Sequence, residues 1–208
     1  MKKIYYIAVV FATLFLAGCG DGIDLPGVNV ETDLNKIPLP DNNVNLEQVE
    51  LKPSTEPMLH EGLHTEEDFQ RIRDKKAAGE EPWVSAYQLL VESQFSQKTA
   101  DTYPTELIKR GISGDENYMN AARGATIVYQ QALRWKIEQD DEYAAKAVEN
   151  LNKWVQTCVG VTGNTNLSLA AGLYGYEFAI AGELLRDYGG WDRADFAAFQ
   201  NWLLKVFY

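Results

Sequence analysis

The sequence contains very little cysteine and histidine, and it has no excess of positive charge. Cys19 and Cys158 are the two cysteines among 208 residues, and His60 and His64 are the only histidines. Two histidines are too few for a histidine-based metal centre, and no carboxylate cluster with ligand spacing accompanies them. We therefore expect no metal and no other cofactor. The chain carries 19 basic and 30 acidic residues without a basic stripe, which argues against a nucleic-acid partner.

After its first 19 residues the sequence also lacks an apolar run of the ~20 residues that a membrane-spanning helix needs. Those first residues begin with Lys2 and Lys3, continue through an apolar run and close on Leu16-Ala17-Gly18-Cys19. This order is typical of a bacterial secretory signal that ends at a cysteine for lipid attachment. We expect residues 1–19 to be a lipoprotein signal peptide with a lipobox, and Cys19 to be the lipidation site. A plain signal peptide and a membrane-spanning anchor are the alternatives.

Lipid attachment would place the protein in the cell envelope of a Gram-negative bacterium, on the periplasmic side or at the outer-membrane surface. Acyl chains add roughly 0.8 kcal/mol per buried methylene group, so two of them hold a protein on a membrane. Without Lys2 and Lys3, 17 basic and 30 acidic residues remain, which gives a net charge of −13. Lipidation of Cys19 leaves Cys158 alone, so no internal disulfide can form. The apolar helical pattern before Cys158 favours a buried thiol there.

Composition divides the remaining chain into a linker and a helical body. Residues 20–58 contain scattered prolines and asparagines with little periodicity, so we interpret them as an extended linker. Over 59–208, apolar residues recur at helical spacing without sustained period-two alternation, which predicts an all-α domain without strands. Residues 96–116 are predicted to form a long polar loop within this domain.

Six helices are expected, and cap residues mark most of their ends. Thr65, with Asp68 at the capping-box position, begins the first helix, Gly79 ends it, and Pro82 begins the second. The third is expected over about 117–139, the fourth after the 140–141 turn, the fifth from 164 or 166, and the sixth after Asp192. The residues of the fifth helix that we expect to face inward are Leu169, Leu173, Tyr176, Ile180, Leu184 and Tyr188.

The spacing between small-residue helices distinguishes two helical architectures. The stretch 122–154 resembles a tetratricopeptide unit, but such units recur every ~34 residues. Here the next comparable helix begins near Ala170, 48 residues after Ala122. This longer interval favours the antiparallel hairpins of an (α/α) toroid. The apolar helical pattern of residues 202–208 continues to the last residue, so we expect an incomplete toroid, the N-terminal part of a longer protein.

Three segments, in this order, resemble the alginate-lyase-like helical toroid proteins. They are GLHTEEDF at 62–69 with GEEPW at 79–83, ALRWKI at 132–137 with DEYAAKA at 141–147, and TGNTNL at 162–167 with AAGLYGYEF at 170–178. The likeness covers about residues 59–208. It implies a polysaccharide lyase that cleaves a uronic-acid-containing, alginate-like glycan by β-elimination, so the implied partner is an anionic polysaccharide or oligosaccharide.

The resemblance also implies which residue types act. In this family an asparagine–histidine pair neutralises the substrate carboxylate, and a tyrosine transfers the proton with an arginine nearby. No metal is needed for that chemistry. No Asn-His dipeptide occurs in the 208 residues, so we expect the catalytic segment beyond Tyr208 and no activity from this chain alone.

Substrate contacts could nevertheless lie within the chain. The loop after the second helix forms part of the cleft rim in the family, and here it carries Tyr103, Lys109 and Arg110. An arginine can hold a carboxylate with two parallel hydrogen bonds, and a tyrosine can stack on a sugar ring. Asn166 is a further candidate, although Asn164 and Asn166 equally suit helix caps. The alternative functions are a non-catalytic glycan-binding lipoprotein and a helical-repeat interaction scaffold.

Overall fold

The computed structural model describes residues 62–208, and this part of the chain is mostly helical. Its α-helices are α2 (Glu66–Ala77), α3 (Trp83–Glu92), α4 (Tyr118–Glu138), α5 (Asp141–Thr157), α6 (Asn166–Leu185) and α7 (Arg193–Phe207). The predicted all-α class is therefore confirmed. The predicted signal peptide, linker and lipidation site at Cys19 lie outside the described residues. No helix within 62–208 is long and apolar enough to cross a membrane.

Local hydrogen bonds set several helix starts, and the caps at Thr65 and Asp192 were predicted. Thr65 caps α2, because its side chain accepts a hydrogen bond from the Asp68 N–H while the Asp68 carboxylate accepts one from the Thr65 N–H at 3.0 Å. Asp140 and Asp192 cap α5 and α7 in the simpler manner, each accepting an N–H from the first turn. These bonds satisfy donors that the first turn of a helix leaves unpaired.

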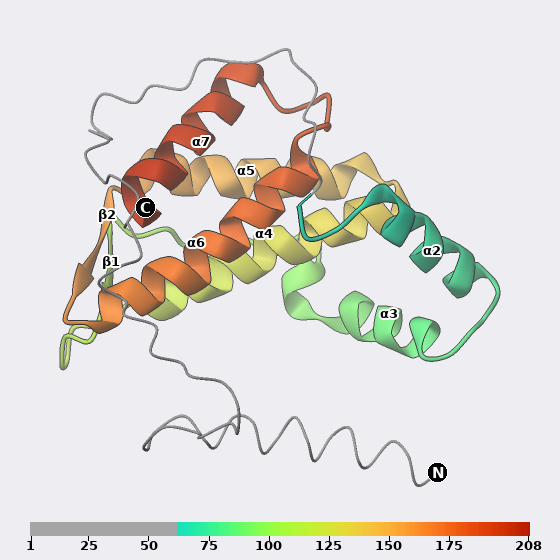
Figure 1. Ribbon diagram of the computed structural model, residues 1–208, viewed down its shortest axis with the longest axis horizontal. Coiled ribbons are helices and arrows are strands. Elements are labelled where there is room, and N and C mark those ends of the chain that lie inside the picture. Colours follow the sequence, from blue (N-terminus) through green and yellow to red (C-terminus); the bar gives the residue numbers. More distant parts are fainter. Residues whose placement is uncertain (1–61) are drawn as a thin grey trace, which may run out of the picture. The chain divides into compact units, whose positions relative to one another are not determined.

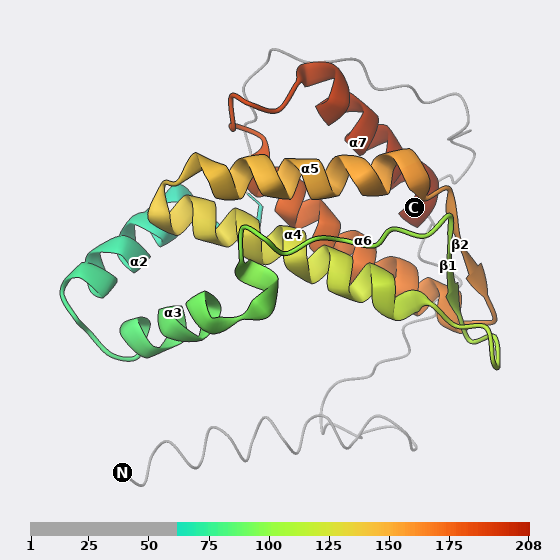
Figure 2. The same ribbon diagram turned by 180° about the vertical axis from the view of Figure 1, so that it is seen from behind.

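The helices α4 to α7 pack as two antiparallel pairs (Figures 1 and 2). Helices α4 and α6 lie side by side and run in the same direction, while α5 and α7 contact each other and run the opposite way. Helix α4 packs against both α5 and α6 and is the centre of the domain. This alternation is compatible with an arc of helical hairpins, and closure into a toroid remains a prediction.

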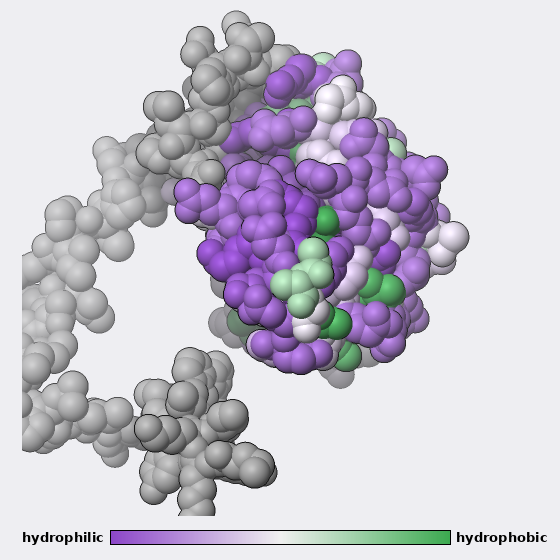
Figure 3. Space-filling model, turned by 90° about the vertical axis from the view of Figure 1, so that its right-hand side faces the viewer, coloured by the Kyte–Doolittle hydropathy of each residue, from purple (hydrophilic) through white to green (hydrophobic). Residues whose placement is uncertain are grey.

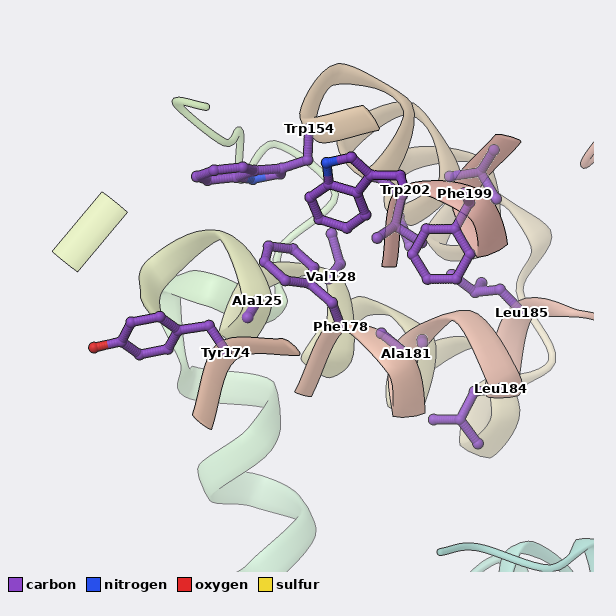
Figure 4. Close-up of a cluster of buried hydrophobic side chains, with 14 of the residues drawn as sticks. Ala125, Val128, Trp154, Tyr174, Phe178, Ala181, Leu184, Leu185, Phe199 and Trp202 are labelled. Atoms are coloured by element: carbon purple, nitrogen blue, oxygen red, sulfur yellow. The ribbon is translucent and has the colours of Figure 1, made fainter. Parts of the chain in front are cut away.

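The hydrophobic core lies where α4, α5, α6 and α7 meet (Figure 4). The ring of Phe178 lies between two indoles, with centroid distances of 5.4 Å to Trp154 and 5.3 Å to Trp202. Phe199 from α7 is buried beside them. Burying Phe178 and Phe199 stabilises the fold by roughly 1.5–3 kcal/mol each.

Helices α2 and α3 attach to the other end of α4 through apolar and polar contacts, and Phe69 is the one residue of these two helices that is buried in the core. The Arg73 guanidinium donates to the Lys136 carbonyl at 2.9 Å, and the Tyr87 hydroxyl donates to the Glu138 carboxylate at 2.6 Å. The surface at this end is mostly hydrophilic, with small separate hydrophobic spots (Figure 3). The two helices therefore add less to the apolar core than α4 to α7 do.

Two short strands contradict the prediction of a strand-free domain. Strand β1 (Leu107–Arg110) pairs in parallel with β2 (Gly160–Gly163), from Leu107 opposite Gly160 to Arg110 opposite Gly163. The predicted loop 96–116 therefore contains a strand, and the 3₁₀ helix η3 (Gln94–Ser96) ends at its first residue. Four residues are too few to display a period-two pattern, and the pairing joins segments far apart in sequence.

The predicted inward face of α6 was also partly wrong. Leu184 is buried as expected, but Leu169, Leu173 and Tyr176 are 48%, 51% and 58% exposed. The face made of Ala170, Tyr174, Gly175, Phe178, Ala181, Gly182, Leu184 and Leu185 is buried instead. Two glycines explain the difference, because a Cβ at Gly175 or Gly182 would lie 2.7 or 2.2 Å from a phenylalanine of α7. Close approach of α7 thus selects the small-residue face.

Candidate functional site

Strand β1 is held on both edges, and this fixes the residues that it carries. One edge pairs with β2. On the other, Asn117 donates to the Leu107 carbonyl at 2.9 Å and accepts from the Lys109 N–H at 2.7 Å. Gly163 has φ of 150°, and a Cβ there would lie 1.7 Å from the Arg110 carbonyl oxygen. Glycine at this position is what allows β2 to approach β1.

Arg110, at the end of β1, lies against two tyrosines. Its Cζ is 4.7 Å from the ring centre of Tyr118 and 5.9 Å from that of Tyr174. Its Nη1 donates to the Tyr174 hydroxyl at 3.0 Å, and the two rings are nearly parallel, with 7° between their planes. We call Arg110, Tyr118 and Tyr174 the Arg110 cluster.

The Arg110 cluster combines an available positive charge with a fixed geometry. Within residues 62–208, no carboxylate forms an ion pair with Arg110. The hydroxyl of Tyr174 points away from the hydrophobic core (Figure 4). Burial raises the pKa of that hydroxyl, which Arg110 opposes, so it remains protonated near neutral pH. A guanidinium held by stacking and by one hydrogen bond retains donors for a planar anion such as a carboxylate.

Lys109 and Asn166 are less suited to substrate than Arg110. The ammonium of Lys109 forms an ion pair with Asp115 at 2.7 Å, so its charge is compensated. Asn166 is the exposed first residue of α6, and its backbone N–H donates to the Asn164 side chain at 2.9 Å. The N-cap of α6 is Thr165, whose side chain makes no cap hydrogen bond, so neither Asn164 nor Asn166 occupies the cap position that was predicted for them. Asn164 lies one residue before that position, and its side chain accepts the first N–H of the helix.

Tyr103 lies apart from the Arg110 cluster. Its side chain is 75% exposed and lines a cavity whose wall contains neither Lys109 nor Arg110. The sequence placed Tyr103 and Arg110 on one loop, and the structure brings them to different surroundings. The cause is β1, which carries Arg110 away to the strand pair.

The segment that leads into Tyr103 is fixed by a buried amide network. The side chains of Asn150 and Gln131 are fully buried. The Asn150 amide donates to the Gln131 side chain and to the Ala100 carbonyl, both at 3.1 Å, and it accepts from the Thr102 N–H at 3.2 Å. The predicted loop is thus ordered over 100–102, because buried polar groups that are all paired fix one arrangement.

A histidine–tyrosine pair was missed at the sequence level, where no partner for the histidines was evident. The Nε2 of His64 lies 2.5 Å from the hydroxyl of Tyr129, 65 residues away in the sequence, and the two rings stack. Burial lowers the pKa of His64, opposed by Asp68, and burial raises the pKa of Tyr129. Both groups are therefore neutral near pH 7. His60 lies outside the described residues.

A half-buried carboxyl lies near this pair. Burial raises the pKa of Glu177 on α6, and a hydrogen bond with Thr126 opposes the rise. The charge of Glu177 also contributes to the raised pKa of Tyr129. No local sequence motif identifies His64, Tyr129 and Glu177 as a group, because they come from the segment before α2, from α4 and from α6.

Cys158 and the acidic residues do not suggest another reactive centre. Cys158 is 2% exposed, as predicted, and burial raises the pKa of its thiol, so it is a poor nucleophile at neutral pH. Among residues 62–208, no group of three or more histidine, cysteine, aspartate or glutamate side chains could hold a metal ion.

Comparison with known proteins identifies one family. The sequence pattern of the family described as Alginate lyase matches residues 72–208, which is more than half of the chain. The match includes every residue of the Arg110 cluster, whereas His64 precedes it. No curated protein and no solved structure matches the chain. The chain therefore belongs to the alginate lyase family, whose activity is that of polysaccharide lyases.

Proposed function

We propose that this chain belongs to a lyase that cleaves a uronic-acid-containing, alginate-like glycan by β-elimination, and that Arg110 binds a substrate carboxylate. The observation that carries this proposal is the Arg110 cluster. It presents a guanidinium with no acidic partner within residues 62–208, in a chain whose acidic residues outnumber its basic ones by 30 to 19. Family membership supplies the reaction class.

β-Elimination needs positive charge at the carboxylate of the sugar. A base removes the proton from the carbon next to the carboxylate, and the electron pair that remains is delocalised onto the carboxylate. This pair forms the carbon–carbon double bond as the bond between the next carbon and the glycosidic oxygen breaks, and an acid protonates that oxygen. The negative charge that develops on the carboxylate must be stabilised by donors that are already in place.

Arg110 meets this requirement through its fixed orientation. Stacking on Tyr118 restricts the guanidinium plane, and the bond to Tyr174 uses one of its five N–H donors. Two parallel donors remain available for a carboxylate. Hydrogen bonds to charged groups contribute about 1.5–3 kcal/mol each. Because little side-chain entropy is left to lose, more of that energy is retained as affinity.

The overall charge of −11 repels a polyanion at long range. Salt screens that repulsion beyond a Debye length of ~8 Å, whereas a contact with Arg110 acts at hydrogen-bond distance. Binding of uronate polymers should therefore strengthen as moderate salt is added at low ionic strength, before the direct contact is itself screened.

Binding is tested first, with alginate oligomers and the purified chain. Arg110→Gln should weaken binding about tenfold or more, since a charge-assisted pair is lost, and Arg110→Lys should restore only part of it. The matched control is Arg193→Gln, which removes the same charge from an exposed position on α7. Unchanged affinity in Arg110→Gln would refute the role of Arg110.

Cleavage is tested separately, on the protein expressed from its native gene. Elimination leaves a conjugated double bond whose ultraviolet absorbance can be followed during incubation with a panel of uronate polymers. No increase for any polymer would remove the proposal of cleavage. Polymer binding without unsaturated product would instead support the non-catalytic glycan-binding alternative.

We also propose that the protein acts while anchored to a membrane of the bacterial envelope through lipid on Cys19. This proposal rests on the basic start, the apolar run and the final Leu16-Ala17-Gly18-Cys19 of the first 19 residues.

A further inference from the structure

A second set of unpaired polar side chains surrounds the cavity that Tyr103 lines. The cavity has a volume of about 250 Å³ and lies between η3, the segment 100–103 and the N-terminal half of α4. Its wall includes Gln94, Tyr103, Asn120 and Arg123. Within residues 62–208, none of these four side chains has a hydrogen-bond or ion-pair partner. We call this the Arg123 cavity.

The Arg123 cavity offers the groups that sugars require. Arg123 supplies five N–H donors in a plane, and the amides of Gln94 and Asn120 supply both donors and acceptors. Phe95 and Ile127 add apolar wall against which the C–H face of a sugar ring can pack. Tyr103, exposed at the wall, can stack on the ring from outside.

The electrostatics of the cavity favour an anion. Its one acidic wall residue, Asp101, accepts hydrogen bonds from Lys153 at 2.6 Å and from Lys146 at 3.4 Å. Both lysines also pair with Glu149. The negative charges of Asp101 and Glu149 balance the positive charges of Lys146 and Lys153, so Arg123 adds one uncompensated positive charge.

The wall is also rigid on one side. The residues immediately before Tyr103 are held by the buried amides of Asn150 and Gln131. A preformed wall lowers the entropy that a ligand must lose on binding. The volume lies below the roughly 300–1,000 Å³ of sites for drug-sized ligands, which suits a single sugar ring.

We propose that the Arg123 cavity binds one carboxylate-bearing sugar unit and acts as an accessory subsite separate from the Arg110 cluster. Its role as a subsite rests on the proposed function, because the substrate must then be a chain of such units. Arg123 binds the carboxylate, Gln94 and Asn120 bind hydroxyl groups, and Tyr103 covers the ring.

Calorimetric titration of the 208-residue chain with sodium glucuronate tests the cavity, with glucose and sodium acetate as comparison ligands. The titrations are made in the Arg110→Gln variant, so that the Arg110 cluster does not contribute. Glucuronate should bind more tightly than either comparison ligand. Arg123→Gln should weaken its binding by roughly 10- to 100-fold, whereas the control Arg193→Gln should leave it unchanged.

Three results would overturn the inference: equal glucuronate binding after Arg123→Gln, equal binding of glucose, or equal binding of acetate. Circular dichroism of each variant confirms that the fold is intact, and Arg123 is exposed, so its replacement leaves the core untouched.

The two proposals, for the Arg110 cluster and for the Arg123 cavity, can fail independently. Loss of polymer binding in Arg110→Gln with normal glucuronate behaviour supports both, whereas unchanged polymer binding refutes the Arg110 proposal and leaves the cavity result standing.

Discussion

Replacing Asn150 by alanine tests whether a buried amide network holds the segment before Tyr103. Asn150 is fully buried and makes three hydrogen bonds of 3.1–3.2 Å. Its loss leaves the side-chain Oε1 of Gln131 without a donor and the Thr102 N–H with only Asp101 as acceptor, at 3.2 Å. A stranded buried group costs about 1–3 kcal/mol, and the vacated volume adds to that, so we expect unfolding free energy to fall by about 2–4 kcal/mol.

Urea unfolding followed by far-ultraviolet circular dichroism measures this change. The matched control is Asn152→Ala on the same helix, whose amide makes one exposed hydrogen bond to Asp195 at 3.1 Å. That variant should lose about 0.5 kcal/mol or less, as is usual for surface positions. If the unfolding free energy of Asn150→Ala also lies within about 0.5 kcal/mol of the wild type, the amide network does not hold the segment before Tyr103. Glucuronate affinity of the Arg123 cavity should fall together with stability.

Three further outcomes are expected. Glu177→Gln should raise the melting temperature at pH 7: burial raises the pKa of Glu177, so its ionised form carries a penalty at high pH that glutamine lacks. That advantage should shrink as the pH falls, because protonation of the wild-type carboxyl removes the penalty, and a constant difference would contradict it. Gly163→Ala should weaken alginate-oligomer binding and lower the melting temperature, because its Cβ would overlap the Arg110 carbonyl; unchanged binding in a titration would show that β2 does not position Arg110. Cys19→Ala should move the protein from the membrane to the soluble fraction after cell lysis, and unaltered fractionation would rule out the lipid anchor.

The local elements of the fold were largely predictable. Thr65 with Asp68, and Asp192, marked helix starts because a cap acts on N–H groups within three residues of it. The strand pair β1–β2 was not predictable, since Leu107–Arg110 is too short for a periodic signal and pairs with a distant segment. The buried face of α6 was not predictable for a related reason, since it depends on α7 packing closely against the glycines of α6.

The candidate site likewise combines features that the sequence predicted with features that depend on the tertiary structure. The family resemblance and arginine chemistry made Arg110 a candidate carboxylate ligand, but its stacking on Tyr118 and its bond to Tyr174 depend on where β1 ends. Lys109 looked equivalent in sequence, and its pairing with Asp115 distinguishes it. Arg123 carried no signal, because it is one of many charged residues on a helix until the cavity beside it is known.

By itself, the sequence determined that this chain is built of helices, where most of them begin and which family it resembles. The helices and their starts depend on hydrogen bonds and side-chain spacing within a few residues, and the resemblance depends on short motifs and their order. The tertiary structure alone decided which side chains meet, such as His64 with Tyr129, and which charges remain unpaired, such as Arg110 and Arg123 within the described residues. Such contacts depend on the packing of whole helices, to which residues far apart in the sequence contribute together.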